Sequence, residues 1–183
     1  MYIGVLGPHR GLSEAVEAMP EILKTITNAR LVLVGSGNSE AHLKKLVSDN
    51  QLSQSVEFTG RQPFYLVPSY IAASKICLHT YADTLSPQSR AGSPTKLFQY
   101  MAMGKPTIVA SSLESAKQLI LRENAGSVYT AGDTHSLAQA VIKLYQDSAM
   151  ADEMGQNGQE AVRKYDWMAE GRKLVDLYEQ LRR

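Results

Sequence analysis

The most informative part of this sequence is Ser93-Pro-Thr-Lys-Leu-Phe-Gln-Tyr-Met-Ala-Met-Gly-Lys-Pro106, which leads directly into Thr107-Ile-Val-Ala110. Ser93 suits a helix N-cap and Pro94 suits the first helical position. At the far end, a glycine followed two residues later by a proline stops the helix. The short apolar run after it is typical of a buried strand. The stretch therefore predicts a capped helix, a glycine stop and a strand, which together form one αβ unit.

The segment before this helix, residues 83–92, is polar and rich in turn-forming residues. A helix that begins after such a loop directs free backbone N–H groups at solvent, and these groups suit a phosphate. Lys96 would lie in the first turn, where the helix dipole disfavours a cation unless an anion compensates it. The alternative is an ordinary αβ unit without a ligand. The candidate phosphate site at the start of the helix consists of Ser93, Pro94, Thr95 and Lys96.

The composition is that of an ordinary globular domain. The chain has 183 residues, 44% of them hydrophobic and 20% charged, which is enough for one core. A net charge of +1 argues against a protein that coats nucleic acid. The sequence has no apolar run of membrane-spanning length and no signal-peptide pattern, and its single cysteine, Cys77, lies in an apolar run. We expect a cytoplasmic protein without disulfides, a metal or a cofactor.

Predicted strands and helices alternate along the chain. Six strands are expected, at residues 2–6, 31–34, 56–59, 76–79, 107–110 and 126–129. Pro20 should kink or split the first helix. This order predicts an α/β fold, with a Rossmann-like, doubly wound and mostly parallel sheet of about six strands and helices on both faces. We expect residues 1–183 to form a single domain with a helical tail over about 148–183.

Two further loops follow the carboxyl ends of predicted strands, where open α/β sheets bind their ligands. The loop from Gly4 to Gly11, which contains Gly7-Pro-His-Arg-Gly11, combines a permissive glycine backbone with Arg10 as a phosphate-binding fork and His9 as a candidate phosphate ligand. The alternative there is a plain glycine-rich turn, and no Walker sequence follows. The loop at 60–63 supplies two polar side chains, Arg61 and Gln62. A solvated surface arginine is the alternative in that loop.

His79 ends the predicted strand at 76–79 and faces the same edge of the sheet. We favour a buried histidine with satisfied hydrogen bonds over a ligand at this position. The acidic residues lie mostly on predicted helix surfaces, so the spacing gives no Ser/His/Asp triad and no carboxylate pair. The pattern therefore indicates a phosphate site without identifying an acid or a base.

Five blocks, in their order along the chain, resemble the carboxyl-terminal half of group 1 (family 4) glycosyltransferases. They span about Gly4 to Trp167, and the block at 93–106 is the most specific. The other four are Gly7-Pro-His-Arg-Gly-Leu12, Ala29-Arg-Leu-Val-Leu-Val-Gly-Ser-Gly37, Val56-Glu-Phe-Thr-Gly60 and Tyr165-Asp-Trp167. The resemblance implies one half of a GT-B fold, in which two Rossmann-like domains enclose the active site. It matches the donor-binding half alone, so an absent amino-terminal acceptor domain or a partner subunit is implied.

The resemblance also implies roles for basic residues. The family's phosphate-binding lysine falls on Arg10, whereas its companion arginine falls on Val5 and is missing. The base-binding loop falls on Gly60-Arg-Gln62. These enzymes mostly transfer sugars with retention and without a tightly bound metal. Arg10 and Lys96 would then stabilise the leaving diphosphate together with the helix start.

A pair of glutamates in the family falls on Ala91 and Gln99. The first is absent, as it is in relatives that share the Ser-Pro-x-Lys-Leu-Phe-Glu-Tyr pattern. The second would hold the nucleotide ribose, and Gln99 keeps one accepting oxygen but lacks the charge. These departures put activity in question and leave the fold prediction intact.

The implied function is that of a nucleotide-diphospho-sugar-binding domain of a retaining glycosyltransferase, which transfers a hexosyl group to a glycan or lipid-linked acceptor. One alternative is a non-catalytic GT-B-like partner or regulatory subunit, which the departures at Val5, Ala91 and Gln99 favour. Another is a nucleotide-sugar epimerase, against which the block at 93–106 argues. We expect no nucleic-acid partner, and peripheral association of the full-length protein with the inner membrane face would fit a lipid-linked acceptor.

Overall fold

Six parallel strands form the centre of the computed structural model, which describes residues 1–82, 95–165 and 167–182. One sheet contains, in this order, β1 (Tyr2–Ile3), β2 (Leu31–Val34) and β3 (Val56–Gly60). The other contains β4 (Cys77–His79), β5 (Thr107–Ala110) and β6 (Gly126–Tyr129). The sheets meet at β1 and β4, where the Leu78 N–H donates to the Met1 carbonyl at 2.8 Å. The spatial order β3-β2-β1-β4-β5-β6 confirms the doubly wound fold.

The first strand is shorter than predicted. Only Tyr2 and Ile3 pair with β2, opposite Leu33 and Val34. Gly4 follows with a φ of 137°, and this backbone conformation turns the chain out of the strand. The prediction of a strand over residues 2–6 is therefore wrong after Ile3, and the strand ends three residues earlier than the apolar pattern indicates.

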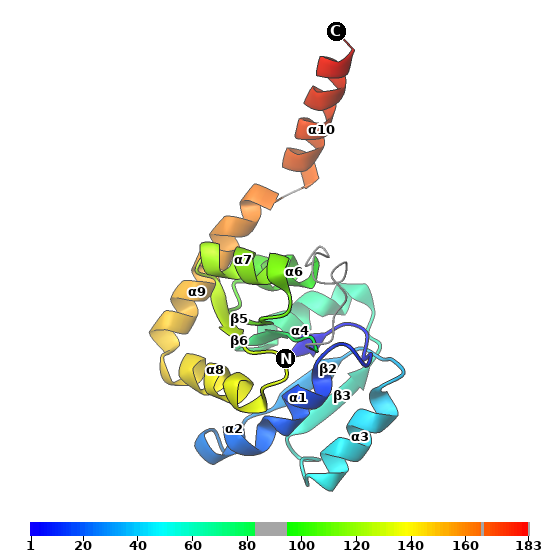
Figure 1. The fold of residues 1–183 in the computed structure, drawn as a ribbon, viewed down its shortest axis with the longest axis vertical. Coiled ribbons are helices and arrows are strands. Elements are labelled where there is room, and N and C mark those ends of the chain that lie inside the picture. The colour runs from blue at the N-terminus through cyan, green and yellow to red at the C-terminus, as the bar shows by residue number, and fades with distance from the viewer. Residues whose placement is uncertain (83–94, 166, 183) are drawn as a thin grey trace.

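Helices cover both faces of the strands (Figure 1). One face packs against α1 (Leu12–Glu17), α2 (Met19–Thr25), α3 (Glu40–Asp49) and α8 (Thr134–Gln146). The other packs against α4 (Val67–Ala73), α6 (Thr95–Ala102) and α7 (Glu114–Arg122), with the short turn η1 (Phe64–Leu66) before α4. Alternate strand residues supply the two cores: Leu33 and Ile108 face the first set of helices, whereas Val34 and Val109 face the second.

Local sequence explains several helix boundaries. The predicted first helix is split, as expected, because Pro20 sits in the first turn of α2, where its missing N–H costs nothing. Asp133 caps α8 as predicted, since its carboxylate accepts from the Ser136 N–H at 2.9 Å. On α6, the predicted apolar stripe is buried, and Gly104 ends the helix region with a φ of 64°. The predicted cap residues of α6, at positions 93 and 94, lie outside the described residues.

The helix α9 (Ser148–Ala161) crosses α6 at very close range. A Cβ at Gly155 would lie 2.2 Å from the Gly104 carbonyl oxygen, and one at Gly158 would lie 3.3 Å from the Ala125 side chain. A side chain at Gly155 would clash with this backbone, and one at Gly158 would require its neighbours to shift. The crossing fixes the carboxyl end of α6, and α6 in turn carries Lys96.

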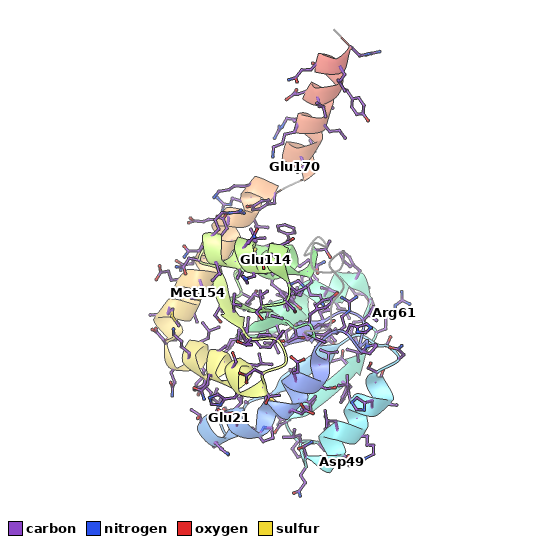
Figure 2. The ribbon with its side chains drawn as sticks, viewed as in Figure 1. Glu21, Asp49, Arg61, Glu114, Met154 and Glu170 are labelled. Atoms are coloured by element: carbon purple, nitrogen blue, oxygen red, sulfur yellow. The ribbon has the colours of Figure 1, made fainter. Side chains whose placement is uncertain are left out.

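The last helix, α10 (Trp167–Leu181), follows the short turn η2 (Val162–Tyr165) and projects away from the rest of the molecule (Figure 1). Its described side chains are all exposed, including Leu174, Val175, Tyr178 and Leu181. Glu170 marks the part of this helix nearest the body (Figure 2). None of the described helices is both long enough and apolar enough to cross a membrane.

Candidate functional site

A small polar pocket of about 170 Å³ opens at the carboxyl ends of β1 and β4. This is the point where the strand order reverses, and doubly wound folds bind their ligands there. Three segments build the pocket: the loop after β1, the end of β4 with the residues that follow it, and the first turn of α6. The residues that line it, which we call the cation pocket, are Gly4, Val5, Arg10, His79, Tyr81, Thr95 and Lys96.

The loop after β1 is held against the end of β4 by backbone contacts. Gly11 has a φ of 62°, and a Cβ there would lie 2.9 Å from the Tyr81 backbone, so no other residue fits without a shift. The Thr80 hydroxyl donates to the Arg10 carbonyl at 2.7 Å. The Ala82 N–H donates to another carbonyl of the loop at 3.1 Å. The fold therefore sets the position of Arg10 before any ligand arrives.

The guanidinium of Arg10 lies over an aromatic ring. Its guanidinium carbon is 4.6 Å from the centroid of the Tyr81 ring, a cation–π contact. The residue is half-buried, and no described carboxylate forms an ion pair with it. A guanidinium in a cation–π contact still has N–H groups available, and these groups suit phosphate oxygens.

Lys96 reaches the same pocket from α6. Its Nζ lies 3.9 Å from the centroid of the Tyr2 ring and within 3.2 Å of the position that a Cβ on Gly4 would take. The residue as a whole is half-buried, and its ammonium is the enclosed part. Burial, and then the nearby charge of Arg10, lower the pKa of Lys96 to about 7.

His79 forms the floor of the pocket. It is 5% exposed, and its Nδ1 has no hydrogen-bond partner among the described residues. The prediction of a fully satisfied histidine is therefore wrong for this nitrogen. Burial, followed by the charges of Lys96 and Arg10, lowers the pKa of His79 to about 3, so the imidazole is neutral near pH 7.

These groups together favour an anion. The described lining brings two cationic side chains within one small volume and includes no carboxylate. The neutral imidazole adds a hydrogen-bonding group without adding charge. An unpaired positive pair in a partly desolvated pocket is costly, and a bound anion of two or more charges removes that cost.

Three of the predicted site residues, Arg10, Thr95 and Lys96, come together in the cation pocket. Gly7 lies on the other side of the loop, in a separate hollow of about 320 Å³. His9 is exposed and does not line the pocket, although its carbonyl helps to hold the loop. The structure thus separates the arginine from the other residues predicted in the same loop.

The loop after β3 forms a third hollow, of about 520 Å³, which Arg61 and Gln62 line together with Phe64. Arg61 is exposed and projects outward from the edge of the domain (Figure 2). The Gln62 side-chain amide donates to the Thr59 carbonyl at 2.7 Å, which holds the loop in its turn. These two residues lie at the same edge of the sheets as the cation pocket but do not line it.

Gln99 lies one turn after Lys96 on α6 and is half-buried, outside the lining of the cation pocket. Ala91, Ser93 and Pro94 lie outside the described residues. Among the residues that the structure describes, no three His, Cys, Asp or Glu side chains gather to hold a metal ion.

Two aromatic residues of the site, Tyr2 and Tyr81, were missed in the sequence. Each supports one cation, and each is far from its partner along the chain. The available signal is weak: each tyrosine borders a predicted strand that ends at this edge of the sheet. A contact between an aromatic face and a cation comes from the tertiary fold, which spacing does not reveal.

Residues 1–161 match the protein family described as glycosyl transferases group 1. The chain belongs to the group 1 glycosyltransferases. The resemblance stated from the sequence blocks is confirmed, and the match covers every strand and all helices up to α9.

Curated relatives of this group 1 glycosyltransferase chain include mannosyltransferases. It is 26% identical over 174 residues to the phosphatidyl-myo-inositol mannosyltransferase of Mycobacterium leprae, covering 94% of this chain and 43% of that protein. It is also 26% identical over 173 residues to a GDP-mannose-dependent monoacylated alpha-(1-6)-phosphatidylinositol monomannoside mannosyltransferase of Corynebacterium glutamicum, covering 94% and 44%. The chain thus spans less than half the length of these relatives.

Solved structures share the fold. HepE of Anabaena, crystallised in complex with UDP, has a TM-score of 0.82 at 19% identity, over 98% of this chain and 48% of that one. The carboxyl-terminal domain of the group 1 glycosyltransferase LpcC of Francisella tularensis has a TM-score of 0.76 at 20% identity, over 91% and 86%. This glycosyltransferase chain therefore has the Rossmann-like fold of a GT-B carboxyl-terminal domain.

Proposed function

We propose that the cation pocket binds the diphosphate of a nucleotide-sugar donor, and that this chain is the donor-binding domain of a retaining hexosyltransferase. The observation that carries the proposal is the convergence of Arg10 and Lys96, from two separate elements, on one pocket in which no described lining residue is a carboxylate. A diphosphate diester carries two negative charges, which match these two cations. The UDP bound in the HepE structure and the GDP-mannose dependence of the Corynebacterium relative support this ligand class.

In the proposed reaction, the bond between the sugar and the β-phosphate breaks, and negative charge grows on the diphosphate. Arg10 offers its N–H edge and Lys96 its ammonium to that charge, which stabilises the leaving group without a metal. His79 is neutral, and one of its ring nitrogens has no hydrogen-bond partner in the part of the chain that the structure describes, so it can take part in a hydrogen bond to the donor. Because both cations are fixed by aromatic rings, little reorganisation is needed when the charge develops.

The remainder of the donor would extend along the same edge of the sheets. The loop of Arg61 and Gln62 is the proposed contact for the base, and Gln99 is the proposed contact for the ribose through its one accepting oxygen. Ser93 and Pro94, which precede the described part of α6, are proposed to complete the phosphate contacts. The acceptor, a glycan or a lipid-linked glycan, would be bound by a further domain or partner, and a lipid-linked acceptor would bring the full-length protein to the membrane surface.

A non-catalytic partner or regulatory subunit with the same fold is the second candidate. Val5 is 59% exposed at the mouth of the pocket and offers no charge where the family resemblance expects an arginine. Such a subunit would bind the nucleotide and lack transfer activity even when joined to its partner.

The test is a thermal-shift and calorimetric panel of UDP-, GDP- and ADP-sugars on this chain. We expect at least one nucleotide sugar to stabilise the fold and to bind with 1:1 stoichiometry, with no sugar transfer by this chain alone. A lack of stabilisation by every member of the panel at millimolar concentration would contradict donor binding. Sustained transfer by the chain alone would contradict the division into donor and acceptor halves.

A further inference from the structure

The ammonium of Lys96 has an unusual set of neighbours. From β1 it meets the face of the Tyr2 ring, and from the loop after β1 it meets Gly4 and the charge of Arg10. From β4 it faces the neutral His79. Among the described residues, no carboxylate and no backbone carbonyl accepts a hydrogen bond from its Nζ.

This environment supports a charged ammonium poorly while the pocket is empty. The cation–π contact with Tyr2 compensates only part of the hydration free energy that the ammonium loses on burial, and Arg10 repels a second positive charge. The lowered pKa of Lys96, about 7, agrees with this geometry. A phosphate group in the pocket would raise the pKa of Lys96 again, because an adjacent anion favours the charged form of an amine.

The position of Lys96 also bears on the cation that the family resemblance expects at Val5 and that this chain lacks there. The Val5 side chain points into solvent, and its loop therefore contributes only one cation, Arg10. Lys96 reaches the underside of the same loop at Gly4, the residue next to Val5. The second cation of the pocket thus comes from α6 rather than from the loop.

We propose that Lys96 is the proton-linked cation of this site: it replaces the loop cation that Val5 does not supply, and it takes up a proton when a nucleotide diphosphate ester binds. This inference rests on the proposed function, and it adds that donor binding weakens as the pH rises above neutrality. Below pH 6 the ammonium is already formed, so binding there no longer depends on pH through this group.

The size of the effect follows from the pKa. With a pKa of about 7 in the empty pocket, Lys96 is about nine-tenths neutral at pH 8, so binding should take up about 0.9 proton at that pH. The dissociation constant should rise about tenfold from pH 6 to pH 8. UDP-glucose and GDP-mannose are suitable probes because their phosphates are diesters, which do not titrate in this range.

The experiment is calorimetry of both probes at pH 6, 7 and 8, with two buffers of different protonation enthalpy at pH 8. Lys96→Arg should bind with a flat pH profile and no proton uptake, because a guanidinium stays charged. Lys96→Met keeps an apolar stem and should bind at least tenfold more weakly at pH 6, also without uptake. The matched control is Lys44→Met, which removes another lysine that lies over an aromatic ring, on α3, and should leave proton uptake unchanged.

The outcomes separate this inference from the proposed function. If neither probe binds at any pH, donor binding itself is wrong. If a probe binds to the unmodified chain without proton uptake, only the role of Lys96 is wrong. Uptake that persists in Lys96→Met would assign the proton to another group, such as His79, and would also overturn the inference.

Discussion

The same strands end in two different cavities. At the carboxyl ends of β1 and β4, the cation pocket of about 170 Å³ contains two cations and a buried imidazole. At the amino ends of β1, β2 and β4 lies a larger cavity of about 350 Å³, lined mainly by apolar side chains, among them Ile22 of α2 and Leu137 of α8. Two cationic side chains at its edge already have partners: Arg30 donates to the Gln54 carbonyl, and Lys75 lies over the ring of Tyr145, which also lines the cavity.

The difference shows that cavity size and binding chemistry are separate properties in this fold. We interpret the larger cavity as incomplete packing of helices against the strand ends, because apolar side chains dominate its lining. In the smaller one, the described residues supply two cations and no carboxylate, which is an arrangement that a ligand completes. We therefore expect substitutions at the amino ends to change stability, and substitutions at the carboxyl ends to change binding.

The largest effect should come from Leu137→Ala at the amino ends. Leu137 is 1% exposed and packs in the core as well as against the cavity, so its loss should lower the free energy of unfolding by about 2–5 kcal/mol. Urea unfolding measures this change, and calorimetry with UDP-glucose and GDP-mannose measures binding. The affinity of the folded variant should stay within twofold of the original; a tenfold loss would mean that the two ends are coupled.

Arg10→Ala is the matching test at the carboxyl ends. A charge-assisted contact contributes about 1.5–3 kcal/mol, so the affinity for a nucleoside diphosphate should fall roughly 10- to 100-fold. The affinity for the bare nucleoside should change little, and so should the free energy of unfolding. Equal losses for the diphosphate and the nucleoside would remove Arg10 from the phosphate site.

Per pH unit, the smallest effect is expected from the buried imidazole. Because the pKa of His79 is lowered to about 3, the unfolded chain binds a proton before the folded chain does as the pH falls below 6.5. The stability of the fold should therefore decrease between about pH 6.5 and pH 3, by at most about 1.4 kcal/mol per pH unit from this group. His79→Gln should flatten that slope in urea unfolding at pH 7, 6, 5 and 4. The control His135→Gln alters an exposed histidine, and an equal change there would disprove the assignment.

Much of the fold could be predicted because local physics determines it. Pro20 splits the first helix, Asp133 caps α8, and the apolar runs at Leu31–Val34 and Thr107–Ala110 are strands with the predicted bounds. The error at β1 arises at Gly4, whose φ of 137° turns the chain out of the strand and which an apolar pattern does not mark.

The site was predicted less completely. Arg10 and Lys96 could be found because each is a basic residue in a loop or first turn at a strand end. The rings that hold them, Tyr2 and Tyr81, depend on contacts between distant parts of the chain. The Nδ1 of His79 has no hydrogen-bond partner among the described residues, and this follows from the tertiary burial of the side chain, which the spacing of residues in the sequence does not reveal.

The attachment of the loop after β1 has a consequence for the speed of binding. The hydrogen bonds from Thr80 and Ala82, together with the close contact at Gly11, leave the loop no need to fold over an arriving donor. Association should therefore proceed in one step, at a rate that follows donor concentration linearly and falls with added salt. Differences in affinity among nucleotide sugars should then arise from differences in their dissociation rates.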